Sequence, residues 1–210
     1  MQHSVSLLSY PRLPLSVALM VLCVLGLFSR PLYAHPHVFV ECAATFVFDE
    51  AGLAGLRQTW RFDEMYSSMI LMDLGIFGAD ELDRQTQDRV RAYAFDQTKS
   101  LNYFTHLFAD GRKMPTPDPG SFAVRLDQGQ LVFEFETPFL FAFTRDEHLL
   151  TLAVYDETFF VFMDFPPLEI EMVDVAEAYH IDWEDRCQTE IRYYFDQVTP
   201  VVVDVAVRRK

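Results

Sequence analysis

A strict alternation of apolar residues is the feature that most limits what this chain can fold into. In residues 38–48 every even-numbered position is apolar, while the odd-numbered positions are mixed. A period of two is that of a β-strand with one face in a core. Turn-forming residues follow at 50–52, and residues 53–63 return with Trp60 and Phe62 on one side. The sequence therefore predicts a β-hairpin with one buried face.

The remainder of the chain predicts a helical segment and then more strands. Residues 64–74 are expected to form a helix with Asp63 as its N-cap, and residues 80–98 a second, more polar helix. Strands are expected at 103–108, 122–126, 131–136, 189–195 and 201–207, and two more within 149–165. The predicted fold class is α+β: a β-rich, sandwich-like domain with a helical insertion after the first hairpin.

Residues 1–34 have the features of a secretory signal peptide. Arg12 precedes an apolar segment at 13–28, and Ala34 ends the stretch. We expect cleavage after Ala34, which leaves a single periplasmic domain, residues 35–210, that is not an integral membrane protein. The alternative is an uncleaved membrane anchor, although the apolar segment is short for a span of ~20 residues.

Acidic residues dominate the chain, whose formal net charge is −14. Without the leader the charge is −16, because residues 1–34 hold two of the 17 basic residues and none of the 31 acidic ones. Such a surface repels nucleic acid and anionic lipid and attracts cations, so we expect no nucleic-acid partner. His180, Asp182 and Glu184 alternate near the C-terminus, as either a cation site or a solvated acidic loop.

Two cysteines lie outside the leader, Cys42 and Cys187. In an oxidising compartment they can form a disulfide between the first strand and the C-terminal region. The alternative is a pair of buried free thiols.

The segment His35-Pro36-His37 is the leading metal-site candidate. After cleavage, His35 would carry a free α-amine, so its amine and imidazole can chelate one ion while His37 supplies a second imidazole. Pro36 has no N–H and blocks a chelate through successive backbone amides. The expected cofactor is a divalent transition metal ion: Zn, Ni, Co or Cu. The alternative is a frayed terminus with two solvated histidines.

Further ligand candidates are less specific. Glu64 follows Asp63 at a strand-to-helix junction, where a carboxylate either reaches a metal or caps the helix. His106 lies in an aromatic strand and is either a ligand or a hydrogen-bonded structural histidine. The methionines at 65, 69 and 72 share one side of the first helix. Thioethers bind soft Cu(I), but this spacing favours burial in the core.

Several segments carry a resemblance to a known family. They are residues 34–40 (AHPHVFV), 60–67 (WRFDEMYS), 103–106 (YFTH), 133–135 (FEF) and 154–161 (VYDETFFV). In this order they resemble a bacterial family of exported proteins of unknown function, labelled as the periplasmic component of an uncharacterised ABC-type transport system. The resemblance implies an association with nickel, cobalt or zinc transport and an inner-membrane transporter or permease as partner.

Enzymatic function is not expected. The chain has no Gly-x-Ser-x-Gly elbow, no phosphate-binding glycine loop and no His-Glu-x-x-His motif. The expected function is a periplasmic metal-binding accessory protein of a Zn/Ni/Co transport system. One alternative is a non-catalytic interaction module that presents residues 139–143 and 159–165 to a membrane permease. Another is a copper protein with an N-terminal histidine chelate.

Overall fold

The fold is described from a computed structural model. It describes residues 14, 16, 20, 36–165, 168–172, 178–187 and 190–210, with the backbone alone at 168–172 and 186–187. Residues 35–210 form one compact unit, separate from residues 1–34. In the described part of the chain, no helix has both the length and the apolar character needed to cross a membrane.

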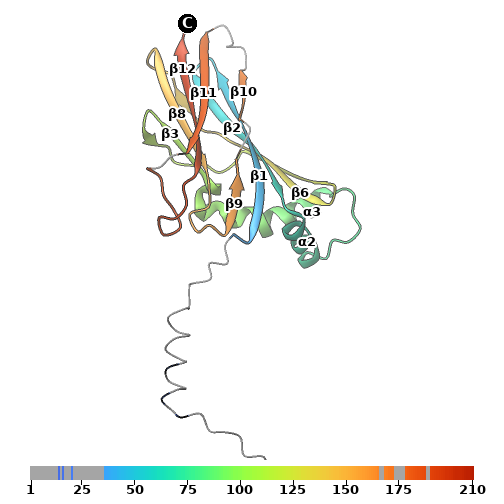
Figure 1. The fold of residues 1–210 in the computed structure, drawn as a ribbon. Coiled ribbons are helices and arrows are strands. Elements are labelled where there is room, and N and C mark those ends of the chain that lie inside the picture. Colours follow the sequence, from blue (N-terminus) through green and yellow to red (C-terminus); the bar gives the residue numbers. More distant parts are fainter. Residues whose placement is uncertain are drawn as a thin grey trace, which may run out of the picture. The chain divides into compact units, whose positions relative to one another are not determined.

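Seven strands form the larger sheet, which is built around the predicted hairpin (Figure 1). Its order is β10-β1-β2-β6-β5, with β7 pairing with β2 and β9 pairing with β1. The strands are β1 (Val38–Asp49), β2 (Gly52–Phe62), β5 (Ser121–Asp127), β6 (Gln130–Thr137), β7 (Phe141–Ala142), β9 (Val161–Asp164) and β10 (Leu168–Met172). All pairs are antiparallel except those of β1 with β9 and β10.

Five strands form the second sheet, in the order β11-β12-β8-β3-β4. They are β3 (Thr105–Ala109), β4 (Arg112–Lys113), β8 (Glu147–Val154), β11 (Tyr179–Cys187) and β12 (Val201–Arg209). Every pair in this sheet is antiparallel. The two sheets are joined inside the core by Gln58 on β2, whose Nε2 donates to the hydroxyl of Thr105 on β3 over 3.0 Å.

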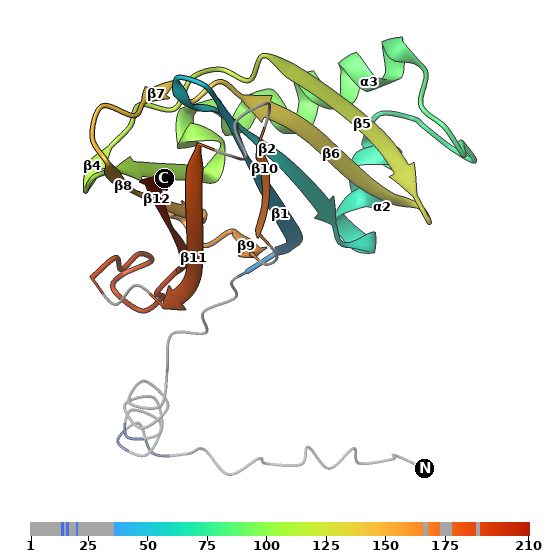
Figure 2. The same ribbon diagram turned by 90° about the horizontal axis from the view of Figure 1, so that it is seen from above.

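The helical insertion lies between β2 and β3. It comprises α2 (Glu64–Asp73), α3 (Arg84–Val90), a π-helical turn η1 (Arg91–Phe95) and a 3-10 segment η2 (Asp96–Phe104). Each α-helix begins at an aspartate that caps it: Asp63 accepts from Tyr66 N–H and Asp83 accepts from Thr86 N–H, both over 2.8 Å. The insertion packs beside β5 and β6, as Figure 2 shows from above.

The core follows the alternation in the sequence. All even-numbered residues of β1 are buried, and Trp60 of β2 lies on the same face. The Trp60 ring packs on Phe95 and Phe104 from the insertion and on Phe135 from β6, with centroids 4.8–5.9 Å apart. The inner face of the larger sheet is thus covered partly by the second sheet and partly by the insertion.

The predicted fold class is confirmed, and several details are wrong. The segment with His180, Asp182 and Glu184, for which a solvated acidic loop was one alternative, lies in the strand β11, which pairs along its whole length with β12. Residues 190–195 form turns and one isolated bridge instead of the predicted strand. Cys42 is a free, buried thiol, so the predicted Cys42–Cys187 disulfide is not formed; the side chain of Cys187 lies outside the described residues. Burial, with a smaller effect of the Asp164 charge, raises the pKa of the Cys42 thiol and keeps it unreactive.

Candidate functional site

Asp63 joins the start of β1 to the start of α2, and we call this place the β1–α2 corner. One carboxylate oxygen of Asp63 caps α2, and the other accepts from Phe39 N–H over 2.8 Å. The Asp63 N–H in turn donates to the Phe39 carbonyl over 2.9 Å. This single residue therefore fixes the first turn of α2 beside the residues that follow the predicted cleavage site.

His37 is held at this corner by the loop before β9. Its N–H donates to the Phe160 carbonyl over 2.9 Å, and the two rings lie with centroids 5.1 Å apart. The loop is shaped by Asp156, which is only 2% exposed. The Asp156 carboxylate accepts from the N–H and hydroxyl of Thr158 and from Val161 N–H, over 2.8–3.0 Å.

An apolar groove of about 640 Å³ opens at the β1–α2 corner. Its wall is formed by residues from β1, β2, α2, η1, η2 and the loop that holds Phe160. The aromatic rings of Trp60, Phe62 and Phe104 line the groove, and His37 is the one histidine among the lining residues. None of the lining residues carries a carboxylate, a thiol, an ammonium or a guanidinium group. Its size and apolar lining are typical of a ligand-binding site.

The methionines of α2 are exposed, so the prediction that they belong to the core is wrong. Met65, Met69 and Met72 are 70%, 43% and 61% exposed. The helix is anchored instead by Ser67 and Ile70, which are 0% and 2% exposed, and the Ser67 hydroxyl accepts from a backbone N–H of β6 over 2.9 Å. Because a serine makes this anchor, a pattern of hydrophobic residues assigns the wrong face to the core.

The four predicted metal ligands are not all brought together. His37 and Glu64 lie at the β1–α2 corner, both with exposed side chains. His35 lies outside the described residues. His106 is on β3, on the opposite face of that strand from Thr105, which points toward β2. Among the described residues, no group of three or more His, Cys, Asp or Glu side chains is arranged to hold a metal ion.

The surroundings of His106 are those of a packed ring. It is 1% exposed and stacks on Tyr155 with centroids 4.2 Å apart. Within the described residues, neither ring nitrogen makes a hydrogen bond of good geometry. Burial and, to a smaller extent, the Lys113 charge lower the pKa of His106, which keeps the ring neutral.

The buried His148 and the partly exposed Asp110 form a pair that the sequence reasoning missed. His148 Nδ1 lies 2.9 Å from an Asp110 carboxylate oxygen, while its Nε2 accepts from the N–H groups of Thr144 and Arg145, both over 3.1 Å. With Nε2 engaged by two donors, the ring cannot take a proton from a substrate. The residues are 38 positions apart and no spacing in the sequence connects them.

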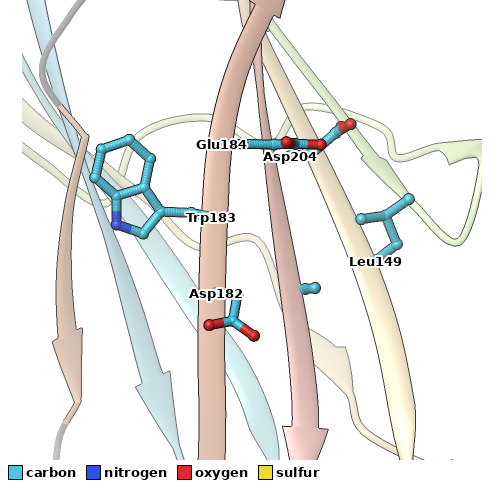
Figure 3. Close-up of a pocket in the computed structure, with 6 residues that line it drawn as sticks. Leu149, Asp182, Trp183, Glu184 and Asp204 are labelled. Carbon is cyan, nitrogen blue, oxygen red and sulfur yellow. The ribbon is translucent and has the colours of Figure 1, made fainter.

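A second hollow lies on β8, β11 and β12, and we call its carboxylates Asp182, Glu184 and Asp204 the acidic edge. Figure 3 shows Glu184 and Asp204 reaching to the same side of the sheet. The Asp182 carboxylate forms an ion pair with Arg208, and its Oδ2 lies 3.4 Å from His180 Nε2. The Asp204 carboxylate accepts a hydrogen bond from the Thr151 hydroxyl over 2.5 Å. One oxygen of Asp182 and one oxygen of Asp204 are thus engaged by protein side chains.

Exposed aromatic side chains extend the corner along the larger sheet. Phe39 on β1 and Phe162 on β9 are 51% and 37% exposed, with ring centroids 6.0 Å apart. In the other predicted contact segment, 139–143, Phe139 and Phe143 are buried, while Leu140 between them is 73% exposed.

Comparisons with known proteins give a family without an assigned activity. A family model described as "Protein of unknown function (DUF1007)" matches residues 20–197. An uncharacterized protein of Haemophilus influenzae is 27% identical over 145 residues, which is 68% of each chain. An uncharacterized 15.5 kDa protein of Spirochaeta aurantia is 29% identical over 134 residues, 62% of this chain and 93% of the relative. The resemblance seen in the sequence is thus confirmed as membership of a family of unknown function.

Proposed function

The chain belongs to the DUF1007 family of proteins of unknown function, and we propose that it is an exported, non-catalytic accessory protein that binds one divalent transition-metal ion, Zn²⁺, Ni²⁺ or Co²⁺, for an inner-membrane transporter. The observation that carries the proposal is the position of His37: exposed, two residues after the predicted cleavage point, and at a corner that it shares with Glu64.

The donor set consists of groups that such ions prefer. After cleavage, His35 supplies its α-amine and imidazole, His37 a second imidazole, and Glu64 a carboxylate from the first turn of α2. His106 is not part of this set, because it is packed in the other sheet. The negative charge of the chain attracts cations to its surface.

The absence of a catalytic role is part of the proposal. The His148–Asp110 pair is the histidine–carboxylate pair of the described residues that most resembles a catalytic dyad, and its Nε2 is occupied by backbone donors. In this proposal an ion bound at the corner is carried or sensed rather than used in chemistry.

Calorimetric titration of the exported protein with Zn²⁺, Ni²⁺ and Co²⁺ tests the proposal. Intact mass first establishes whether the chain begins at His35. The double variant His35→Ala/His37→Ala is expected to lose at least about 100-fold in affinity, since ligands are removed outright and even supporting residues are worth 10–100-fold. Its free energy of unfolding should change by less than about 0.5 kcal/mol, because His37 is not on the buried face of β1.

Two controls make this test specific. His180→Ala removes an exposed histidine from β11 and should leave the affinity unchanged. One extra residue before His35 moves the amine while keeping both imidazoles, so affinity should fall without any side chain being lost. Unchanged affinity in the double-alanine protein would show that the proposed site is wrong.

A second candidate function is an interaction module for a membrane permease. It is favoured by the exposed Phe39–Phe162 pair, which lies on neighbouring strands at the same end of the larger sheet as the corner. A photo-crosslinking residue at position 39 would capture an inner-membrane protein in cells if this role is correct, whereas the same residue at the exposed Phe77 would not.

A further inference from the structure

The exposed methionine face of α2 is unusual for a helix that packs on a sheet. Met65 and Met69 are one helical turn apart, and both side chains line the groove at the β1–α2 corner. Each of these side chains leaves apolar surface in contact with water. Burying that surface would stabilise the fold by about 25 cal/mol per Å². A role for the thioether sulfur atoms themselves accounts for this exposure.

The lining of the groove selects one kind of ion. No lining residue carries a carboxylate, a thiol or an amine, so the soft and borderline donors are the two thioethers and the His37 imidazole. The other donor atoms of the lining are the uncharged hydroxyl and amide oxygens of Tyr66, Tyr93, Gln97 and Thr98. Hard ions require oxygen ligands, and thioethers select soft ions such as Cu(I). The faces of aromatic rings such as Trp60 and Phe62 in the wall attract cations.

We propose that this groove binds a single Cu(I) ion through Sδ of Met65, Sδ of Met69 and an imidazole nitrogen of His37. Residues at i and i+4 of a helix project from one face, so both sulfur atoms can reach one ion. The contacts of His37 with Phe160 hold its backbone and ring at the wall of the same groove.

This site goes beyond the proposed divalent site. Its ligands are side chains between residues 37 and 69, so it needs neither the α-amine of His35 nor cleavage of the leader. It does share His37, which is why the decisive substitutions are placed at the methionines.

The test is an anaerobic titration of the exported protein with Cu(I) in competition with bicinchoninate, a chromophoric Cu(I) chelator. We expect one ion per chain. Met65→Leu/Met69→Leu should weaken Cu(I) binding by at least about 100-fold while keeping the groove apolar, since leucine and methionine have similar volumes. Met72→Leu is the matched control: it is exposed on the same helix but does not line the groove, so affinity should not change.

Two further measurements distinguish this proposal from the divalent site. The double-leucine variant should bind Zn²⁺ and Ni²⁺ as the wild type does, and His35→Ala should leave Cu(I) affinity unchanged. Copper X-ray absorption of the loaded protein should show sulfur neighbours, which the double-leucine variant lacks. Wild-type Cu(I) affinity in the double-leucine variant, or no Cu(I) binding by the wild type, would overturn the proposal whatever the outcome with divalent ions.

Discussion

The groove and the acidic edge are both hollows with potential ligand atoms, but they use those atoms differently. At the acidic edge, Asp182 is paired with Arg208 and Asp204 with the Thr151 hydroxyl, so two of the three carboxylates bind side chains of the same sheet. At the groove, thioether sulfurs of exposed methionines stand among aromatic rings. Acidic residues therefore mark the surface of this protein, while soft donors in an apolar setting mark its candidate site.

The largest effect on the groove is expected from a change in the loop whose Phe160 holds His37. Asp156→Ala deletes a buried carboxylate that accepts three hydrogen bonds within its loop, and leaves those donors unsatisfied. We expect the free energy of unfolding in urea to fall by about 3 kcal/mol, since hydrogen bonds to charged groups contribute about 1.5–3 kcal/mol each. Affinity for Cu(I), measured on the folded fraction, should fall with it because Phe160 no longer fixes His37.

Glu157→Ala is the control for that prediction. Glu157 is the exposed neighbour of Asp156, and its removal should change stability by less than about 0.5 kcal/mol. Equal stabilities of the two variants would mean that the carboxylate of Asp156 does not hold the loop.

The groove and its surroundings show how much of the candidate site could be predicted from the sequence. The alternation of β1 and the cap at Asp63 follow from local rules, and both were predicted. The groove was not, because it depends on Phe160 and α2 meeting from distant parts of the chain. Its methionines were assigned to the core because the helix is anchored through Ser67, a polar residue whose partner is a backbone group of β6.

A similar limit applies to the second sheet. The alternation of His180, Asp182 and Glu184 was compatible with either a cation site or a solvated acidic loop, and only pairing with β12 shows that these residues lie on a strand, β11. His148 and Asp110 gave no signal, because their contact is set by the register of β3 against β8. Long-range pairing, rather than local propensity, decides these features.

The contribution of Asp110 to the stability of the protein should depend on pH. Asp110 does not line the groove. Burial by itself would raise the pKa of Asp110, but hydrogen bonds from His148, Leu149 N–H and Arg145 outweigh it and lower the pKa. A lowered folded-state pKa stabilises the protein above the unfolded value of ~3.9, and this contribution is lost as the pH falls through the folded-state pKa.

Asp110→Asn should therefore lower the free energy of unfolding by about 1–2 kcal/mol at pH 7, with the difference from wild type shrinking below about pH 4. Urea unfolding at pH 7 and pH 3 measures both values. Cu(I) and Zn²⁺ affinities at pH 7 should equal those of the wild type. A difference that grows on acidification would contradict the assigned direction of the pKa shift.

The smallest expected effect concerns the acidic edge itself. Glu184 lies directly opposite Asp204 in the β11–β12 ladder, and like charges in that position are destabilising by about 0.2–1 kcal/mol. Glu184→Gln should raise the free energy of unfolding by about 0.5 kcal/mol, and high salt should remove this gain by screening the repulsion. Asp182→Asn, which gives up the contact with Arg208, should bring no such gain. If Glu184→Gln instead lowered stability and weakened binding of a divalent ion, the acidic edge would be holding a cation between its carboxylates. The contrast with the groove would then fail, because both hollows would bind metal.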